Sequence, residues 1–227
     1  TGGNVSFYNE SPGGSVDPTP VIGTVGLLTD VDRAVRPWFA RVGDDVILLG
    51  TTRGHLGGSS YWAHVLDLVG GAPPPVDLQA EARLVDLLVA LAERALMTSA
   101  HDVSDGGIGV ALAECAMGGP YQDSGFGAQI DLRTVQGTLG APDVLFGEDQ
   151  GRAILSAPPA RRDTILALAA THQVPATVIG SVRAEDATLE IVLREASISV
   201  PVASLRDSYF EAIPRRMATH AVREAAD

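Results

Sequence analysis

Two aspartates stand directly before a pair of glycines near the middle of the sequence, a combination that can hold a metal ion and a phosphate. Asp102 and Asp105 precede Gly106 and Gly107. N–H groups at a helix start attract anions, and neighbouring carboxylates tolerate a phosphate there when a metal ion lies between them. The motif therefore suggests a metal-bridged phosphate site. The alternative is an aspartate N-cap on a tightly packed helix.

The residues that follow this motif predict the helix that must position it. Apolar residues recur at helical spacing, so we expect a helix that begins at about Asp105 and buries one face. The glycines would let a ligand approach the backbone closely. Gly118 and Gly119 supply a stop signal after this helix. The residues of the apolar face are Ile108, Ala111, Leu112, Cys115 and Ala116.

Two further stretches carry groups suited to an anion or a cation. Residues 2–6 combine backbone N–H groups with the amide of Asn4 and the hydroxyl of Ser6, which share one face of an extended chain. Residues 57–60 resemble another glycine-rich helix start, with Ser59 or Ser60 as the cap. Both stretches are candidate binding segments.

A third polar stretch, residues 146–152, lies just before a predicted strand. Acids with an amide at a strand edge could hold Mg²⁺ or recognise a hydroxylated ligand. An ordinary solvated turn is the alternative interpretation. The polar residues are Glu148, Asp149, Gln150 and Arg152.

Composition excludes several kinds of chemistry. All 16 basic residues are arginine, which rules out a Walker-type lysine and Schiff-base catalysis. The net charge of −12 argues against a nucleic-acid surface. The five histidines show no metal-ligand spacing, and we expect His101 to be a hydrogen-bonded structural residue. Cys115 is expected to be a packed core thiol, which fits a reducing cytoplasm.

The pattern along the chain predicts a layered α/β domain. Residues 30–42 form a polar connection and are the best candidate for a domain boundary. We expect strands over residues 2–10, 18–28, 45–50, 128–132, 151–157, 176–182 and 188–193. We expect helices after Ser59 or Ser60, after Asp77 and from about Asp105, and over residues 160–170 and 202–215. Residues 134–146 carry too few apolar residues for an assignment, and no run is long enough to cross a bilayer.

Four strings in order resemble one family. They are Gly-Gly-Asn-Val-Ser-Phe-Tyr-Asn-Glu (2–10), Pro-Thr-Pro-Val-Ile-Gly-Thr-Val-Gly (18–26), Ala-His-Asp-Val-Ser-Asp-Gly-Gly (100–107) and Leu-Phe-Gly-Glu-Asp-Gln-Gly-Arg (145–152). Together they are similar to the C-terminal part of the synthetase subunit of phosphoribosylformylglycinamidine synthases, within the aminoimidazole ribonucleotide synthetase superfamily. The similarity covers essentially the whole chain.

The resemblance implies an α/β fold with layered (α+β) organisation, in which helices pack against a mixed sheet. Residues 1–33 would be the last strands of the second N-type, ATP-binding domain, and residues 34–227 the second C-type domain. Most of that N-type domain and the whole first half of the subunit would lie outside this chain. We therefore expect the chain to be part of a longer protein and inactive alone.

The resemblance also implies an activity. Members of the family are ligases of purine biosynthesis that convert formylglycinamide ribonucleotide, ATP and glutamine-derived ammonia to formylglycinamidine ribonucleotide, ADP and phosphate, through an iminophosphate. In the family motif the residues matching Gly3, Asn4 and Ser6 contact ATP, Mg²⁺ and the nucleotide substrate. The family's catalytic histidine lies outside this chain.

The remaining motifs would form a second, auxiliary nucleotide site that holds a structural ADP or ATP with Mg²⁺. Its residues would be Asp102, Asp105, Gly107, Glu148 and Gln150. The implied partners are the rest of the synthetase subunit, a glutaminase subunit and a small bridging subunit. Neither nucleic acid nor a membrane is expected, and the location is cytoplasmic. The alternatives are a non-catalytic nucleotide-binding or docking module, and another synthetase of the superfamily.

Overall fold

The structure, a computed structural model, describes residues 10–15, 22–28, 30–122, 124–185 and 188–224. The chain divides into two compact units, Thr1–Ala34 and Val35–Asp227. Among the described residues, no helix combines the length and the apolar character needed to cross a bilayer.

The first unit contains a short hairpin and one helical turn. β1 (Glu10–Ser11) pairs antiparallel with β2 (Gly14–Ser15), and η1 (Val31–Arg33) follows Asp30. The strand predicted over residues 18–28 is wrong for residues 22–28, which belong to no strand and are exposed. A strand needs a hydrogen-bonding neighbour, and the described residues of this unit provide none for this segment. Residues 2–9 and 18–21 of the predicted strands lie outside the described residues.

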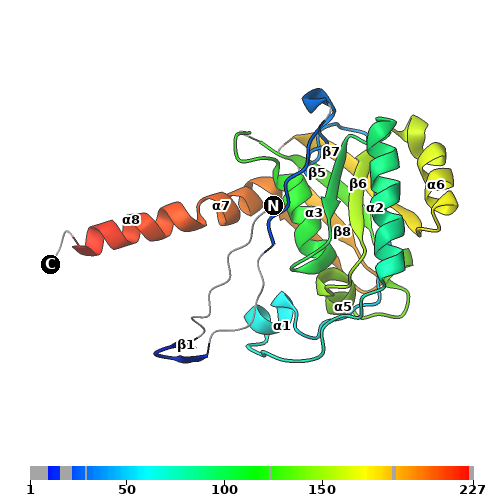
Figure 1. Ribbon diagram of the computed structural model, residues 1–227. Coiled ribbons are helices and arrows are strands. Elements are labelled where there is room, and N and C mark those ends of the chain that lie inside the picture. Colours follow the sequence, from blue (N-terminus) through cyan, green and yellow to red (C-terminus); the bar gives the residue numbers. More distant parts are fainter. Residues whose placement is uncertain (1–9, 16–21, 29, 123, 186–187, 225–227) are drawn as a thin grey trace. The chain divides into compact units, whose positions relative to one another are not determined.

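The described strands of the second unit form one seven-stranded sheet, in the order β4-β6-β3-β7-β5-β8-β9 (Figure 1). Neighbouring strands are antiparallel except β5 and β8, which are parallel, so the mixed sheet implied by the resemblance is confirmed. The strands are β3 (Asp45–Leu49), β4 (Ser99–Asp102), β5 (Phe126–Asp131), β6 (Ala153–Ala157), β7 (Ala176–Glu185), β8 (Thr188–Val192) and β9 (Ser197–Pro201).

Helices cover both faces of this sheet, and two hydrophobic cores result. The central strand β3 shows why, because its five residues are all buried and alternate between the two faces. Val46 and Leu48 join the core beneath α3 (Gly107–Met117), α5 (Ala141–Phe146) and α7 (Val202–Phe210). Ile47 and Leu49 join the core beneath α2 (Leu78–Glu93) and α6 (Arg162–Thr171), which lie across the sheet from α3 (Figure 1).

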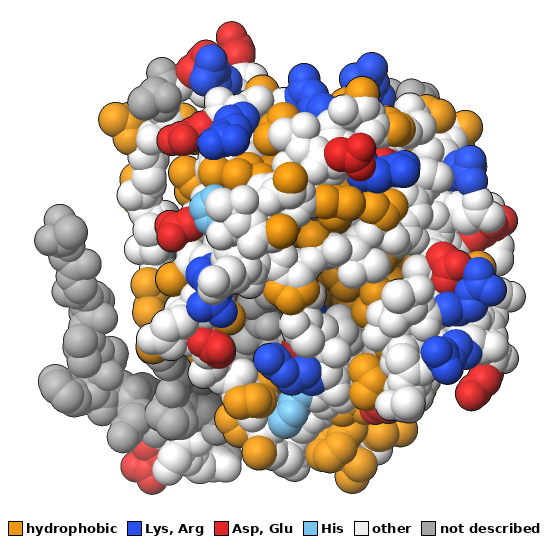
Figure 2. Space-filling view, turned by 90° about the vertical axis from the view of Figure 1, so that its right-hand side faces the viewer, with side chains coloured by type: hydrophobic (Ala, Val, Ile, Leu, Met, Phe, Trp, Pro, Cys, Tyr) orange, Lys and Arg blue, Asp and Glu red, His pale blue; other side chains and the backbone are white. Residues whose placement is uncertain are grey.

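The other helices are short or peripheral. They are α1 (Ser60–Val65), α4 (Arg133–Gln136), η2 (Pro159–Arg161) and α8 (Ala212–Glu224). On the face that carries α2 and α6, arginines are interspersed with acidic side chains, and small hydrophobic patches lie between them (Figure 2). This mixture is typical of an ordinary protein surface.

Several predicted helix boundaries are confirmed at their caps. The Asp77 carboxylate accepts hydrogen bonds from Gln79 N and Ala80 N, both at 3.0 Å, at the start of α2. The Ser59 hydroxyl accepts from Trp62 N at 3.3 Å at the start of α1. The glycine stop signal after α3 is also confirmed, because Gly118 is its C-cap. Such caps act within one helical turn, so local sequence can specify them.

Other boundaries were missed or misplaced. The short edge strands β4 and β9 were not predicted. β4 shows little apolar alternation, whereas β9 does alternate, with Ile198 and Val200 following serine residues, but over only five residues. The helix predicted from about Asp105 begins at Gly107, after Gly106 adopts a left-handed conformation with φ +78°. The single helix predicted over residues 202–215 is two, α7 and α8, with Glu211 between them. Residues 134–146 contribute to two short helices, α4 and α5.

Candidate functional site

The acid–glycine motif spans the end of β4 and the start of α3. Asp102 ends the strand. Val103 N donates to Arg152 O at 3.0 Å, which connects the loop to the segment directly before β6. Gly106 N, at the helix start, donates to Glu148 Oε1 at 2.8 Å. No side chain of the motif caps the helix. The aspartate N-cap interpretation is therefore wrong, because a carboxylate 42 residues away occupies that position.

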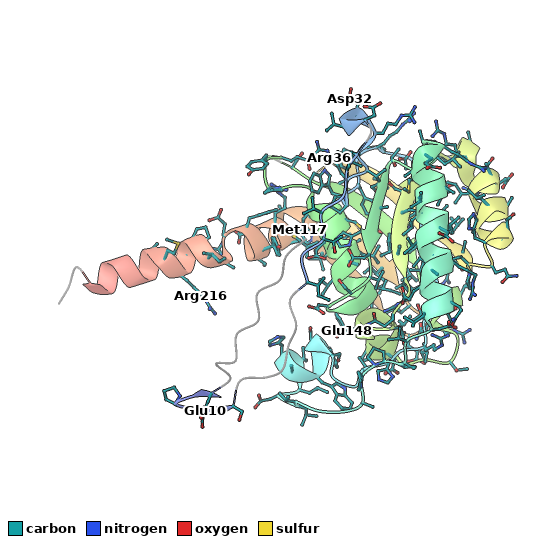
Figure 3. The ribbon with its side chains drawn as sticks, in the orientation of Figure 1. Glu10, Asp32, Arg36, Met117, Glu148 and Arg216 are labelled. Atoms are coloured by element: carbon teal, nitrogen blue, oxygen red, sulfur yellow. The ribbon has the colours of Figure 1, made fainter. Side chains whose placement is uncertain are left out.

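Glu148 joins two helix starts that are distant in sequence. Its Oε1 also accepts from Ser60 N, the first residue of α1, at 2.8 Å. Its own N–H donates to His55 O at 2.9 Å. Figure 3 shows Glu148 close to α1. A carboxylate is stabilised at helix starts by unpaired N–H groups and by the positive end of the helix dipole.

Asp149 fixes the loop that precedes α1. Its Oδ2 accepts from Arg53 N and Gly54 N, each at 2.8 Å, and its Oδ1 accepts from His55 N at 3.3 Å. The residue is only 3% exposed. Three consecutive N–H groups directed at one carboxylate form the kind of concave backbone arrangement that binds anions.

Arg152 holds the same turn from inside the protein. Its Nε donates to Asp149 O at 3.0 Å, and its Nη2 donates to Gly147 O at 2.6 Å. Its Nη1 lies 3.9 Å from Asp149 Oδ2 and donates to Thr52 Oγ1 at 3.3 Å. Burial lowers the pKa of the guanidinium to about 10, and the nearby Asp149 and Glu148 carboxylates oppose this shift. The solvated-turn interpretation of residues 146–152 is wrong, because the buried, hydrogen-bonded side chains of Asp149 and Arg152 anchor this turn.

The structure brings three of the five predicted auxiliary residues together. Asp105, Glu148 and Gln150 line one pocket of about 200 Å³. The rest of its lining is Gly57, Gly58, Gly71, Pro73, Pro74 and Ser104. Asp102 instead lines an adjacent pocket of about 290 Å³ against α2, which Gln150 also reaches.

The fifth auxiliary residue, Gly107, lies in a packed contact. A Cβ added to it would lie 2.7 Å from Gly147 O and 2.8 Å from Leu145 O. The residue is buried and has φ +66°. Its lack of a side chain lets α3 approach the turn that carries Glu148.

The donor set for a metal ion is incomplete in the part of the chain that the structure describes. No group of three or more His, Cys, Asp or Glu residues there could hold a metal ion. Gly3, Asn4 and Ser6, the residues matched to ATP, Mg²⁺ and substrate, lie outside the described residues. Their assignment stays a prediction.

His101 and Cys115 have the structural surroundings expected from the sequence. His101 Nδ1 lies 2.6 Å from Asp102 O, and its Nε2 lies 3.4 Å from Glu114 Oε2. Cys115 is buried in the core, and burial raises the pKa of its thiol well above the ordinary value. A buried thiol with a raised pKa is a poor nucleophile.

The sequence analysis did not identify the hydrogen-bond partners of Glu148 and Asp149. Ser60 N and Gly106 N reach Glu148 across 88 and 42 residues. Asp149 reaches Arg53 N across 96 residues. No local pattern marks such contacts, and only the acid-rich string itself could have drawn attention to them.

Comparison with known proteins identifies similar chains. Residues 41–192 match the family model described as AIR synthase related protein, C-terminal domain. The chain is 43% identical over 216 residues to the phosphoribosylformylglycinamidine synthase subunit PurL of Thermobifida fusca. The aligned region covers 94% of this chain and 26% of that protein. The chain thus spans about a quarter of the length of the curated relatives it matches.

Solved structures share the fold. The structure titled T. maritima PurL complexed with FGAR superposes with a TM-score of 0.63 at 23% identity, over 78% of this chain and 30% of that one. The structure of PurLQS from Thermotoga maritima gives a TM-score of 0.57 at 24% identity, over 78% of this chain and 28% of that one. At these identities the likeness concerns the fold.

Proposed function

This chain belongs to the family of AIR synthase related proteins through their C-terminal domain, and from that premise we propose that it is the C-terminal part of a phosphoribosylformylglycinamidine synthase synthetase subunit. One observation carries the proposal. Curated relatives named PurL are about 40% identical over nearly all of this chain, while the chain spans about a quarter of their length. The resemblance of the four sequence strings agrees with it.

In this proposal the protein is a ligase that forms a carbon–nitrogen bond. It converts formylglycinamide ribonucleotide, ATP and glutamine-derived ammonia to formylglycinamidine ribonucleotide, ADP and phosphate. Mg²⁺ would neutralise phosphate charge during the transfer. Gly3 would permit close approach of ATP, Asn4 would offer an amide oxygen to Mg²⁺, and Ser6 would contact the nucleotide substrate.

The second unit would support this chemistry by fixing the conformation of its own loops. Glu148 and Asp149 fix the starts of α1 and α3 and the loop before α1. We also propose an auxiliary nucleotide site at Asp102, Asp105, Gly107, Glu148 and Gln150. The pocket shared by Asp105, Glu148 and Gln150 supports it, and the separate positions of Asp102 and Gly107 weigh against all five residues contacting one ligand.

The proposed partners are the remainder of the synthetase subunit, a glutaminase subunit and a small bridging subunit. The solved assembly titled PurLQS, whose PurL fold this chain shares, supports them. A cytoplasmic location is proposed with them, in keeping with a single free, buried cysteine.

Activity of the longer protein that contains this chain tests the proposal. Ammonium salt can replace the glutaminase, so ADP and phosphate release should require formylglycinamide ribonucleotide, ATP, Mg²⁺ and ammonia only. We expect Asn4→Ala and Ser6→Ala to reduce turnover by roughly a hundredfold or more, as for groups that position a transition state. Gln79→Ala, an amide removed from an exposed position on α2, is the matched control. Full activity in both active-site variants, or turnover by the 227-residue chain alone, would contradict the proposal.

A second candidate function is a non-catalytic nucleotide-binding or docking module. The observation in its favour is that Asp105, Glu148 and Gln150 share a pocket within the second unit alone. Replacing residues 1–33 with a flexible linker in the longer protein separates the two functions. The ligase proposal expects catalysis to be lost, whereas the docking alternative expects unchanged catalysis with weaker assembly.

A further inference from the structure

We propose that Glu148 takes the place of a bound anion at the starts of α1 and α3, and so closes these N–H groups to external phosphate. The sequence alone suggested a phosphate at this position. In the structure, a single oxygen of Glu148 accepts from Ser60 N and from Gly106 N, both at 2.8 Å. The inference concerns these contacts and does not depend on the ligase proposal.

The geometry is that of a charge-assisted hydrogen-bond pair. Distances of 2.7 to 2.9 Å are typical when an ionised acceptor meets N–H donors. The two donors come from segments 46 residues apart, Ser60 and Gly106, so the carboxylate also joins them. An incoming phosphate would have to displace it.

The anchoring of the Glu148 backbone makes displacement costly. Its N–H donates to His55 O, and the next residue, Asp149, holds Arg53 N, Gly54 N and His55 N. Arg152 ties down the same turn through Gly147 O and Asp149 O. Glu148 is thus presented from a rigid segment.

The pocket beside Glu148 has the wrong charge for a free phosphate. Its lining contains two acids, Asp105 and Glu148, together with an amide, a hydroxyl, glycines and prolines. No basic side chain is among the residues that line it. A phosphate dianion placed there would meet like charge without compensation. The residues present therefore do not fit a phosphate held directly at these helix starts.

Titration of the 227-residue chain with inorganic phosphate, followed by the amide resonances of Ser60 and Gly106, tests the proposal. We expect these resonances to stay unchanged in the wild type and in Glu148→Gln, whose amide oxygen still accepts both N–H groups. In Glu148→Ala, Ser60 N and Gly106 N lose their acceptor and one of the two acids leaves the pocket. We therefore expect a saturable shift of both resonances in this variant, at phosphate concentrations that leave the wild type unchanged. Glu93→Ala removes an exposed acid from the end of α2 and is the control for net charge.

Three results would overturn the proposal. They are saturable shifts of Ser60 and Gly106 in the wild type, no gain of binding in a folded Glu148→Ala, and a gain in Glu148→Gln equal to that in Glu148→Ala. If Glu148→Ala does not fold, Glu148→Ser takes its place, because a side chain this short also leaves Ser60 N and Gly106 N without their acceptor. A folded Glu148→Ser that gains no phosphate binding would refute the proposal.

Discussion

Gly107 is the position where α3 comes closest to the turn that carries Glu148. With φ +66° and backbone oxygens 2.7 and 2.8 Å from the place of a Cβ, it has no room for a side chain. Gly107, one of the two glycines that suggested a ligand site, is thus explained by packing between two backbone segments. A glycine motif alone does not distinguish a ligand from a neighbouring chain.

Replacement of this glycine should be strongly destabilising. We expect Gly107→Ala to lower the free energy of unfolding by about 2 to 4 kcal/mol, because overpacking and a left-handed conformation both contribute. Urea denaturation measures it. Gly137→Ala is the matched control, since Gly137 has φ +54° but nothing within 4 Å of a Cβ, and should cost about 1 kcal/mol. Equal losses in the two variants would contradict the packing argument.

Asp44 gives the protein a predictable dependence on pH. Burial raises the pKa of its carboxyl above 3.8, although the hydrogen bond from Thr98 Oγ1 opposes the shift. The folded state therefore holds this proton more tightly than the unfolded state. The resulting stability is complete below pH 3.8 and is lost as pH rises through the folded-state pKa. The contribution of Asp44 to the unfolding free energy of the wild type should therefore decrease as pH rises through this range. The Asp44→Asn variant should lack this decrease.

Asp131 provides a control of opposite sign. Hydrogen bonds from Arg133 lower the pKa of this exposed carboxyl, so its contribution is present above 3.8 and is lost as pH falls. Urea denaturation across a pH series compares Asp44→Asn, Asp131→Asn and the wild type. Identical pH profiles for Asp44→Asn and the wild type would show that Asp44 is not protonated preferentially in the folded state.

At the scale of elements, α2 is the helix that local sequence specifies most completely. Asp77 caps it, and Leu84, Leu87 and Leu91 form the buried face. The cap satisfies two N–H groups that the helix itself leaves unpaired. Local and tertiary requirements therefore coincide in this helix.

Loss of that cap should be measurable. We expect Asp77→Ala to reduce the free energy of unfolding by about 1 kcal/mol. Asp86→Ala, which removes an exposed acid from the middle of the same helix, should change it by less than about 0.5 kcal/mol. Thermal or urea unfolding compares them. A cost for Asp86→Ala as large as for Asp77→Ala would point to net charge and not to capping.

At the scale of the whole molecule, the second unit contains the seven-stranded sheet and both hydrophobic cores. The first unit contributes a two-stranded hairpin and one turn among its described residues. The predicted division into residues 1–33 and 34–227 is a proposal about domains, and it has a direct test.

A chain of residues 35–227 should fold as the second unit does. We expect its urea midpoint to match that of the full 227-residue chain, because the sheet and its cores are retained. Far-UV circular dichroism and the denaturation midpoint provide the measurement. A substantially lower midpoint, with loss of helical signal, would show that residues 1–34 stabilise the second unit.

The sequence by itself determined the elements whose signals are local. Patterns within a few residues indicate the Asp77 and Ser59 caps and the Gly118 stop. The same kind of pattern indicates the apolar face of α3 and the buried strand β3. Helix periods and caps depend on neighbours one turn away, which the sequence displays directly. The α/β class and the family resemblance were accessible in the same way.

The tertiary structure decided what those elements do together. It paired Glu148 with Ser60 N and Gly106 N, buried Arg152, and separated Asp102 from Asp105. It also showed that residues 22–28, although apolar, form no strand. These outcomes depend on contacts between segments tens of residues apart. The energy of each contact depends on which group from the distant segment faces the side chain, and the local sequence does not show that group. A carboxylate next to glycines can face a metal, a solvent molecule or a helix start, and only the folded chain shows which.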